Sequence, residues 1–323
     1  MTTSNAFRID THQHHVPEFY KKALAGIGVN GSGENAWPKW SIEQSMDVLE
    51  RKGIAAQVSS ISSPGVYFGD VDFATKISRE CNDYSARMVA DHRSRVAALA
   101  VVPLPDTVAA CKELEYALDT LKLDGVSLLT HVGKAYLGQS VYDEFFAELN
   151  RRKAVVFLHP VRPNLEGLAD YDFPTGTVEL TTDTTRAVVN MFYHGYPERY
   201  PDIRWILSHA GGMLPMVIYR LQNMSKRPEV APRLPKGVDH YLKQMYFDLA
   251  QASVPLIQNA LTDIADPAKI LFGSDYPFSQ AGERVVDDVI RGIESFDGYD
   301  AAQRQMILRD NALALFPRFA TAH

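Results

Sequence analysis

Short, mainly apolar runs recur along the chain, and each is followed by a longer segment in which apolar residues return every three or four positions. There are eight such runs, at residues 6–9, 55–61, 95–102, 124–129, 154–158, 202–207, 245–249 and 269–272. Most do not alternate between apolar and polar residues, which is typical of strands buried on both faces of a parallel sheet. Eight strand–helix units in succession predict a closed (β/α)8 TIM barrel, formed by residues 1–323 as a single domain.

Two of the expected strand–helix connections are unusually long. Residues 16–39 follow the first run and residues 161–178 follow the fifth, and the first of these is rich in glycine and tryptophan. Long loops on a barrel often form a lid or the wall of a pocket. The helix after the first connection is expected to start at Ser41, with Gln44 completing a capping box, and to stop at Gly53.

A two-domain, doubly wound protein is the alternative interpretation of the same alternation. Such a protein would carry a glycine-rich phosphate-binding loop after its first strand. This chain has Asp10-Thr11-His12-Gln13-His14 at that position instead. The barrel is therefore the favoured fold.

Composition narrows the class of protein without identifying it. The chain has 323 residues, of which 46% are hydrophobic and 22% charged, and its formal net charge is -6. A negative net charge without a basic run argues against a nucleic-acid partner. No apolar run approaches the ~18 residues of a membrane span, and no signal peptide is evident. With only Cys81 and Cys111, the protein is expected in a reducing compartment, the cytoplasm.

His12 and His14 are the first candidates for chemistry. Residues two apart in a strand point to the same face, so both imidazoles can aim at one point, as metal-binding histidines do. Two histidines with this spacing are by themselves weak evidence for a metal site, because surface histidines at the end of a strand can have the same spacing. His159, His209 and Asp275 strengthen it, since they follow the fifth, sixth and eighth runs. In a barrel, the carboxyl ends of all strands lie on one rim, where active sites form.

These motifs together resemble the amidohydrolase superfamily, in the branch of the aminocarboxymuconate-semialdehyde decarboxylase-like proteins. The matching segments are Asp10-Thr11-His12-Gln13-His14, Leu158-His159-Pro160, Ser208-His209-Ala210-Gly211-Gly212 and Gly273-Ser274-Asp275-Tyr276-Pro277. The resemblance implies one divalent ion held by His12, His14, His159 and Asp275, with His209 as a catalytic or substrate-orienting residue beside it. Thr130-His131 follows the fourth run, so no lysine is present there to bridge two metals. Three nitrogens and a carboxylate suit Zn²⁺, and Mn²⁺ with added waters.

Two reactions are compatible with such a site. In non-oxidative decarboxylation, the metal orients the substrate and Asp275 protonates the ring carbon. In hydrolysis of a lactone, ester or amide, a metal-bound hydroxide attacks a carbonyl group. The branch resembled consists mainly of decarboxylases, which favours the first reaction, with small aromatic carboxylates as substrates and a homodimer as the expected assembly. A barrel that has lost its chemistry is the third possibility, and the intact set of candidate ligands argues against it.

Some segments resemble the subgroup that includes 6-methylsalicylate decarboxylase. They are residues 37–41, 63–70 and 136–138. If the subgroup resemblance holds, an apolar wall would bind the flat ring of the substrate, and it would consist of Trp37, Trp40, Phe68 and Tyr276. Arg162 would then be the cation that binds the substrate carboxylate. Plain core packing explains any one of the aromatic residues equally well, and a solvated loop explains Arg162.

Overall fold

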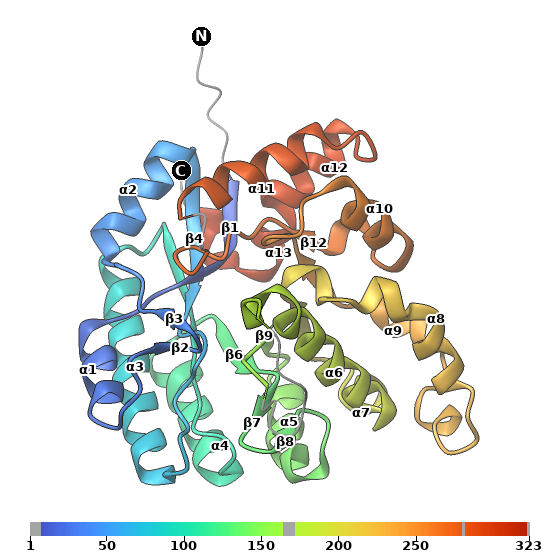
Figure 1. The fold of residues 1–323 in the computed structure, drawn as a ribbon, viewed down its shortest axis with the longest axis horizontal. Helices are drawn as coiled ribbons and strands as arrows, with labels where there is room; N and C mark the ends of the chain where they lie inside the picture. Colours follow the sequence, from blue (N-terminus) through green and yellow to red (C-terminus); the bar gives the residue numbers. More distant parts are fainter. Residues whose placement is uncertain (1–7, 164–171, 280–281, 322–323) are drawn as a thin grey trace.

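In the computed structural model, which describes residues 8–163, 172–279 and 282–321, parallel strands form a barrel and helices surround it (Figure 1). Following the order in which they neighbour one another, the strands are β1 (Arg8–His14), β4 (Ile54–Ser60), β5 (Val96–Ala100), β6 (Gly125–Leu129), β9 (Val155–His159), β10 (Arg204–Leu207), β11 (Tyr246–Asp248) and β12 (Ile270–Leu271). Each of the eight overlaps one predicted run, and β1 extends beyond its predicted run to His14. The part of the first run at residues 6–7 lies outside the described residues.

The barrel closes between β1 and the segment around the end of β12. Thr11 donates a backbone hydrogen bond of 2.9 Å to Phe272, and His14 donates one of 2.8 Å to Tyr276. Between them, the backbone N–H of Asp275 donates to the carbonyl of His12 at 2.8 Å. The bonds that complete the barrel therefore also fix the first and last predicted site residues side by side.

Helices follow the strands as the periodicity predicts. Their bounds are α1 (Glu18–Ala25), α2 (Ile42–Lys52), α3 (Val71–Asp91), α4 (Thr107–Glu115), α5 (Asp143–Arg151), α6 (Glu179–Tyr193), α7 (Tyr196–Arg199), α8 (Leu214–Ser225), α9 (Val238–Leu242), α10 (Pro255–Ile264), α11 (Arg284–Ser295), α12 (Ala301–Gln305) and α13 (Asn311–Leu315). The predicted start and end of α2 are confirmed: the Ser41 hydroxyl accepts from the N–H of Gln44 at 3.2 Å, and Gly53 has a φ of 63°.

The first long connection is more structured than expected. It contains α1, in which Tyr20 and Leu24 lie one turn apart and are both buried. A two-stranded hairpin, β2 (Gly31–Ser32) and β3 (Asn35–Ala36), follows. A second hairpin, β7 (His131–Val132) and β8 (Ala135–Tyr136), follows β6. Within the second long connection, residues 164–171 lie outside the described residues.

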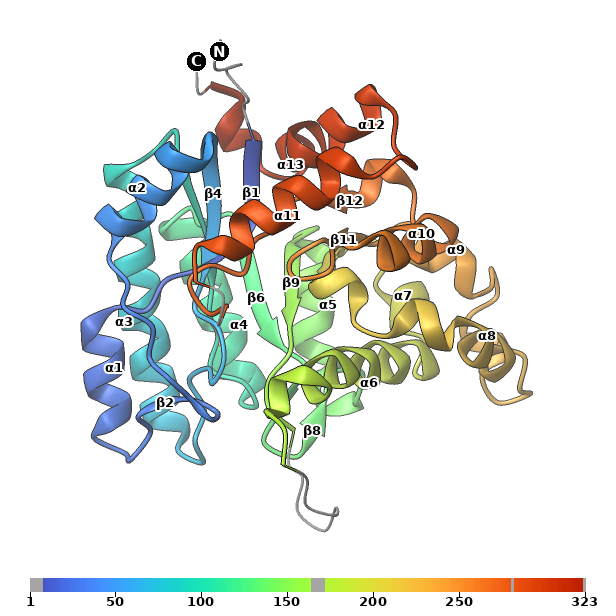
Figure 2. The ribbon, with the colours of Figure 1, turned by 45° about the horizontal axis from the view of Figure 1, so that its top comes forward.

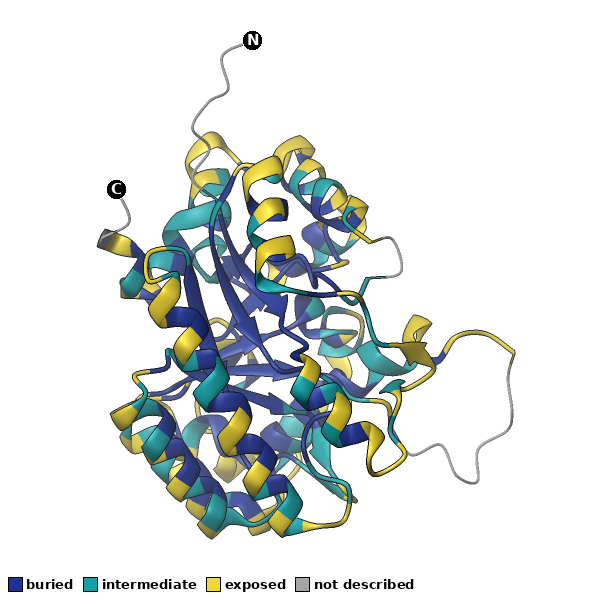
Figure 3. Ribbon diagram, turned by 90° about the vertical axis from the view of Figure 1, so that its left-hand side faces the viewer, coloured by how far each residue is buried: buried dark blue, intermediate teal, exposed yellow. Residues whose placement is uncertain are grey.

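The hydrophobic core has two layers. Most residues of the barrel strands are buried, whereas the helices expose their outer faces (Figure 3). Inside the barrel, side chains such as Ile9, Ala97 and Val155 pack against Phe316 and Phe319, which follow α13. Figure 2 shows α13 beside the beginning of β1. This C-terminal segment fills the end of the barrel where the strands begin, so the end where they finish is the one available for a site.

Candidate metal centre

His12 and His14 point to the same side of β1, as the period of a strand requires. Their Nε2 atoms are 3.1 Å apart, and both side chains are buried. The strand continues through His14 instead of ending before the histidines. Gln13 faces the other way, where its amide donates to Asp10 at 2.8 Å and its carbonyl accepts from Ser45 at 3.0 Å. The predicted convergence of the two imidazoles is therefore present in the fold.

Asp275 brings a carboxylate to the same point from the opposite edge of the barrel seam. Its Oδ1 atom is 3.1 Å from Nε2 of His14, 3.3 Å from Nε2 of His12 and 4.0 Å from Nε2 of His159. The residue has a φ of 65°, a left-handed conformation that non-glycine residues adopt rarely. His209 and Gln251, after the next two strands around the barrel, share this feature with a φ of 53° each. Such strain concentrates at functional sites.

His159 and His209 complete a cluster of five side chains. The ring of His159 lies 4.8 Å from that of His14, and the ring of His209 lies 5.0 Å from that of His12. His12, His159, His209 and Asp275 each offer one ligand atom, and these four atoms lie within 4.8 Å of one another. His209 is thus as well placed to bind a metal as the residues predicted to do so, which leaves its predicted role beside the metal open.

The four histidines share one orientation, with Nδ1 turned away from the centre and bonded to an oxygen. The partners of Nδ1 are Asp248 for His12 at 3.0 Å, Ser60 for His14 at 3.1 Å, the Pro160 carbonyl for His159 at 2.8 Å and the Ala250 carbonyl for His209 at 3.0 Å. An Nδ1–H donated to such an oxygen leaves the lone pair on Nε2. The outer bonds therefore direct four nitrogen lone pairs toward one point.

This arrangement fits a cation. The Nε2 atom of His159 is buried and has no hydrogen-bond partner among the described residues. The Nε2 atoms of His12 and His14 are 3.1 Å apart, so without a metal one of them must carry a proton that it donates to the other. A divalent ion in the centre would bind the unpaired nitrogen of His159 and replace that proton. Imidazole nitrogens with a carboxylate oxygen are a donor set that suits Zn²⁺ and Mn²⁺.

Without a metal, the charges in the cluster balance through protonation. Burial opposes a charge on His12, but Asp248 and Asp275 overcome it and raise its pKa to about 10. Burial would likewise raise the pKa of Asp275, yet His12 holds it well below its usual range. Burial lowers the pKa of both His14 and His159. A metal ion entering the site would take the place of the His12 proton, so binding releases a proton.

Asp248 is the functional residue that the sequence did not single out. It is fully buried at the end of β11. One carboxylate oxygen accepts from Nδ1 of His12, and the other accepts from the backbone N–H groups of His209 and Ala250, both at 3.0 Å. It therefore fixes the ring of His12 and the backbone that carries His209. The strand-end rule that found the other residues applies to it equally.

A cavity of about 650 Å³ opens over the cluster. His159, His209 and Asp275 line its floor, and Arg162, Gln251 and Phe278 are among its other lining residues. The Phe278 ring lies 5.5 Å from that of His14. The amide of Gln251 donates to Oδ2 of Asp275, on the side of the carboxylate away from His12 and His14. Ring, amide and cation thus surround a space large enough for a small aromatic acid.

Of the five predicted substrate-binding residues, only Arg162 lines this cavity, where it lies 3.3 Å from Glu34. The four aromatic residues belong instead to the apolar layer between strands and helices. Trp37 packs on Tyr20 at 5.7 Å, Trp40 on Tyr84 at 6.4 Å and Phe68 on Phe73 at 6.4 Å, and Tyr276 is buried in the same layer. None of these four side chains is among the residues that line the cavity, so their predicted contact with a substrate stays a prediction, and Phe278 is an aromatic ring that does line it. His15, bonded to Ser59 and Ser85, faces away from the centre.

Comparison with known proteins identifies the family to which this chain belongs. The profile of the amidohydrolase family matches residues 9–318. The chain belongs to this family. The match confirms the resemblance recognised from the four motifs. Over 320 residues, the chain is 33% identical to a 6-methylsalicylic acid decarboxylase of Penicillium expansum, with 96% of each chain covered.

Solved structures agree with the family assignment. A structure described as amidohydrolase II superposes with a TM-score of 0.88 at 30% identity, covering 95% of this chain and 99% of that one. A 5-carboxyvanillate decarboxylase of Novosphingobium aromaticivorans, complexed with manganese and a nitrobenzoic acid, superposes with a TM-score of 0.82 at 18% identity, covering 97% and 96%. The similarity to the 5-carboxyvanillate decarboxylase, at 18% identity, supports the fold alone. Among the described residues, no helix is both long enough and apolar enough to cross a membrane.

Proposed function

We propose that this family member is a metal-dependent, non-oxidative decarboxylase of a small aromatic acid with a hydroxyl group ortho to the carboxylate. One observation carries the proposal: four inward-facing Nε2 atoms and the Asp275 carboxylate converge at the floor of a cavity of about 650 Å³. The similarity over nearly the whole chain to a 6-methylsalicylic acid decarboxylase supports the choice of reaction.

His12, His14, His159 and Asp275 would hold the divalent ion. When bound there, the ion would supply positive charge that neutralises and orients the substrate carboxylate and hydroxyl. Asp275, which is charged in the resting site, would first take up a proton from solvent and would then deliver it to the ring carbon that bears the carboxylate. The bond between that carbon and the carboxylate then breaks, its electron pair returns to the ring, and CO₂ leaves. The amide of Gln251 on Oδ2 would aim the carboxyl group at the ring carbon.

His209 would orient the substrate beside the metal. Its Nδ1 is tied to the Ala250 carbonyl, so Nε2 is the nitrogen available to the cavity. Arg162, which lies at the cavity wall beside Glu34, would attract the acid. Phe278 would pack on the aromatic ring in the role first expected of the tryptophans. These assignments place one polar group on each side of the substrate.

Further parts of the proposal concern the metal, the assembly and the location. We propose Zn²⁺ or Mn²⁺ as the metal, a homodimer as the assembly and the cytoplasm as the location, with residues 1–323 as one domain. The 5-carboxyvanillate decarboxylase structure contains manganese, and the donor set accepts either ion. Metal analysis of the protein as isolated tests the identity of the metal, and sedimentation of the full chain tests the homodimer.

Product analysis separates the proposed reaction from hydrolysis. The protein, loaded with Zn²⁺ or Mn²⁺, is incubated in D₂O with ortho-hydroxybenzoates and, separately, with lactones and esters. The proposal predicts CO₂ and a phenol with one deuterium at the carbon that carried the carboxylate. Hydrolysis of a lactone or ester, with no CO₂ from any acid, would replace the decarboxylase by the hydrolase. No turnover by protein that holds one metal per chain would reject both.

A further inference from the structure

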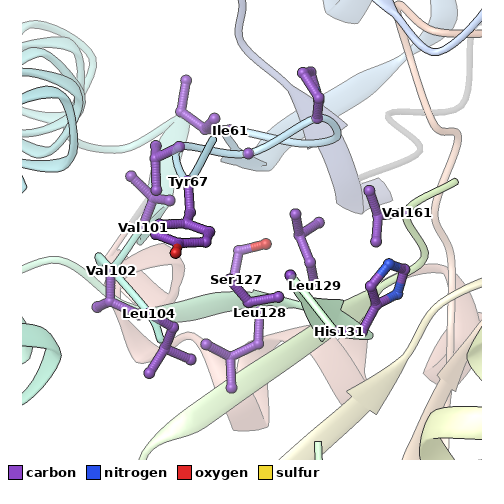
Figure 4. Close-up of a pocket in the computed structure, with 15 residues that line it drawn as sticks. Ile61, Tyr67, Val101, Val102, Leu104, Ser127, Leu128, Leu129, His131 and Val161 are labelled. Carbon is purple, nitrogen blue, oxygen red and sulfur yellow. The ribbon is translucent and has the colours of Figure 1, made fainter. Parts of the chain in front are cut away.

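A second cavity lies beside the metal centre, between the carboxyl ends of β4, β5 and β6 (Figure 4). Its volume is about 180 Å³, and among the described residues none lines both this cavity and the larger one. The wall is mainly aliphatic, with Ile61, Val66, Val101, Val102, Leu104 and Leu129 as its chief members. We call it the apolar cavity. Its described lining includes no lysine, arginine, aspartate or glutamate, so it disfavours a charged ligand.

Ser127 is one of three polar side chains in this mainly apolar wall, together with Tyr67 and His131. It lies on β6, and its side chain points into the middle of the lining residues (Figure 4). The residue is only 5% exposed, and its hydroxyl has no hydrogen-bond partner among the described residues. Burying an unpaired hydroxyl costs free energy that an aliphatic residue would not. A ligand with one polar group would provide the missing partner.

His131 adds a second polar group on the other side of the apolar cavity. Its Nδ1 atom is 3.3 Å from Oδ2 of Asp183, which is fully buried and also accepts from the hydroxyls of Thr130 and Tyr136. If Nδ1 donates to that carboxylate, Nε2 is left as an acceptor on a ring that lines the cavity. The cavity then offers a hydroxyl at Ser127 and an acceptor at His131, and each is able to bond to a ligand hydroxyl.

The size of the apolar cavity limits the ligand to a single ring. An apolar cavity of ~150 Å³ is known to take up benzene. The 180 Å³ available here therefore accommodates one six-membered ring with a small substituent. We propose that the apolar cavity binds a small neutral phenol, whose hydroxyl bonds to Ser127. This inference rests on the cavity itself and does not depend on the proposed decarboxylase activity.

Two fluorinated probes of nearly equal size test the proposal on the metal-loaded protein. ¹⁹F NMR measures the affinities of 4-fluorophenol and 4-fluorotoluene, in which a methyl group of similar size replaces the hydroxyl. In Ser127→Ala, the affinity for 4-fluorophenol relative to 4-fluorotoluene should fall up to about tenfold, the size of a lost hydrogen bond.

Val132→Phe, which places a larger side chain in the cavity wall, should weaken the binding of both probes at least about tenfold. Val132→Leu replaces it if the phenylalanine variant does not fold.

A matched control separates this cavity from the one over the metal. Ser63 lines the larger cavity only, so Ser63→Ala removes a hydroxyl there and should leave both affinities unchanged. An unchanged ratio in Ser127→Ala would overturn the proposal, and so would unchanged affinities in a folded Val132 variant. Failure of the wild-type protein to bind either probe up to its solubility limit would also overturn it and leave the cavity to water.

Discussion

The Nε2 atoms of His12 and His14 lie 3.1 Å apart, while the Nδ1 atom of each ring contacts a side-chain oxygen behind it. The strand sets the spacing of the two rings, and the outer oxygens set their direction. Without a metal, this arrangement requires a proton between the two Nε2 atoms and a charge on His12 that is buried. The arrangement is explained by a cation that all the rings face.

Asp275→Asn tests the proposed proton donor. The amide keeps the shape of the carboxylate but cannot deliver a proton, so CO₂ release should fall by at least about 10²-fold while the fold is retained. Circular dichroism and a CO₂ assay measure the two effects. Asp297→Asn, at an exposed position, is the matched control and should leave the rate unchanged. A folded Asp275→Asn variant with near wild-type turnover would remove Asp275 from its assigned role.

His209→Asn decides whether His209 binds the metal or acts beside it. The proposed role predicts a variant that keeps most of its metal and loses activity, since the four remaining side chains still hold the ion. Metal content per chain is measured by elemental analysis after dialysis, in parallel with turnover. A folded variant without metal would instead make His209 a ligand, which its distance from the other donor atoms permits.

Asp248→Asn tests the outer bond to His12. The asparagine oxygen can still accept from the N–H groups of His209 and Ala250, which leaves its NH₂ group facing Nδ1 of His12. Nδ1 must then become the acceptor, so the proton moves to Nε2 and blocks its lone pair. Metal affinity should fall about 10- to 100-fold with little change in fold. A competition titration with a chelator measures it, and unchanged affinity would contradict the assigned orientation of His12.

His194 should make the stability of the protein depend on pH. Partial burial, aided by the charge of Arg233, lowers its pKa below the ordinary value of 6.5. The unfolded chain therefore binds the proton first as the pH falls, and the folded state loses stability below that value. His194→Gln should lack this loss, so its free energy of unfolding relative to wild type should rise between about pH 7.5 and about pH 5.

Urea unfolding at several pH values measures the His194 effect, with His240→Gln as an exposed control. The expected difference is below about 1 kcal/mol, because the ring of His194 is partly solvated. Parallel pH profiles for the wild-type protein and His194→Gln would show that His194 contributes nothing to the pH dependence.

The barrel and the cluster of histidines with Asp275 could be predicted from local sequence patterns, whereas the residues that line the substrate cavity could not. A strand-end position on a barrel fixes where a side chain lies, and this was enough to bring His12, His159 and Asp275 together. Asp248 obeys the same rule, but a single aspartate within an apolar run gives no further signal. Trp37 lies in a long connection whose hairpin lines the cavity at Gly33 and Glu34. Nothing in the local pattern shows that the Trp37 side chain packs on Tyr20 of α1 instead of facing the cavity.

Metal-dependent release of CO₂ tests the central claim most directly. Metal-free protein, and the same protein reloaded with Zn²⁺ or Mn²⁺, are given 6-methylsalicylate and a set of dihydroxybenzoates, and CO₂ and the phenol are quantified together. We expect equal amounts of CO₂ and phenol from at least one acid, only in the reloaded protein, and none from Asp275→Asn. Equal CO₂ release with and without metal, or none from any acid in protein holding one metal per chain, would contradict it.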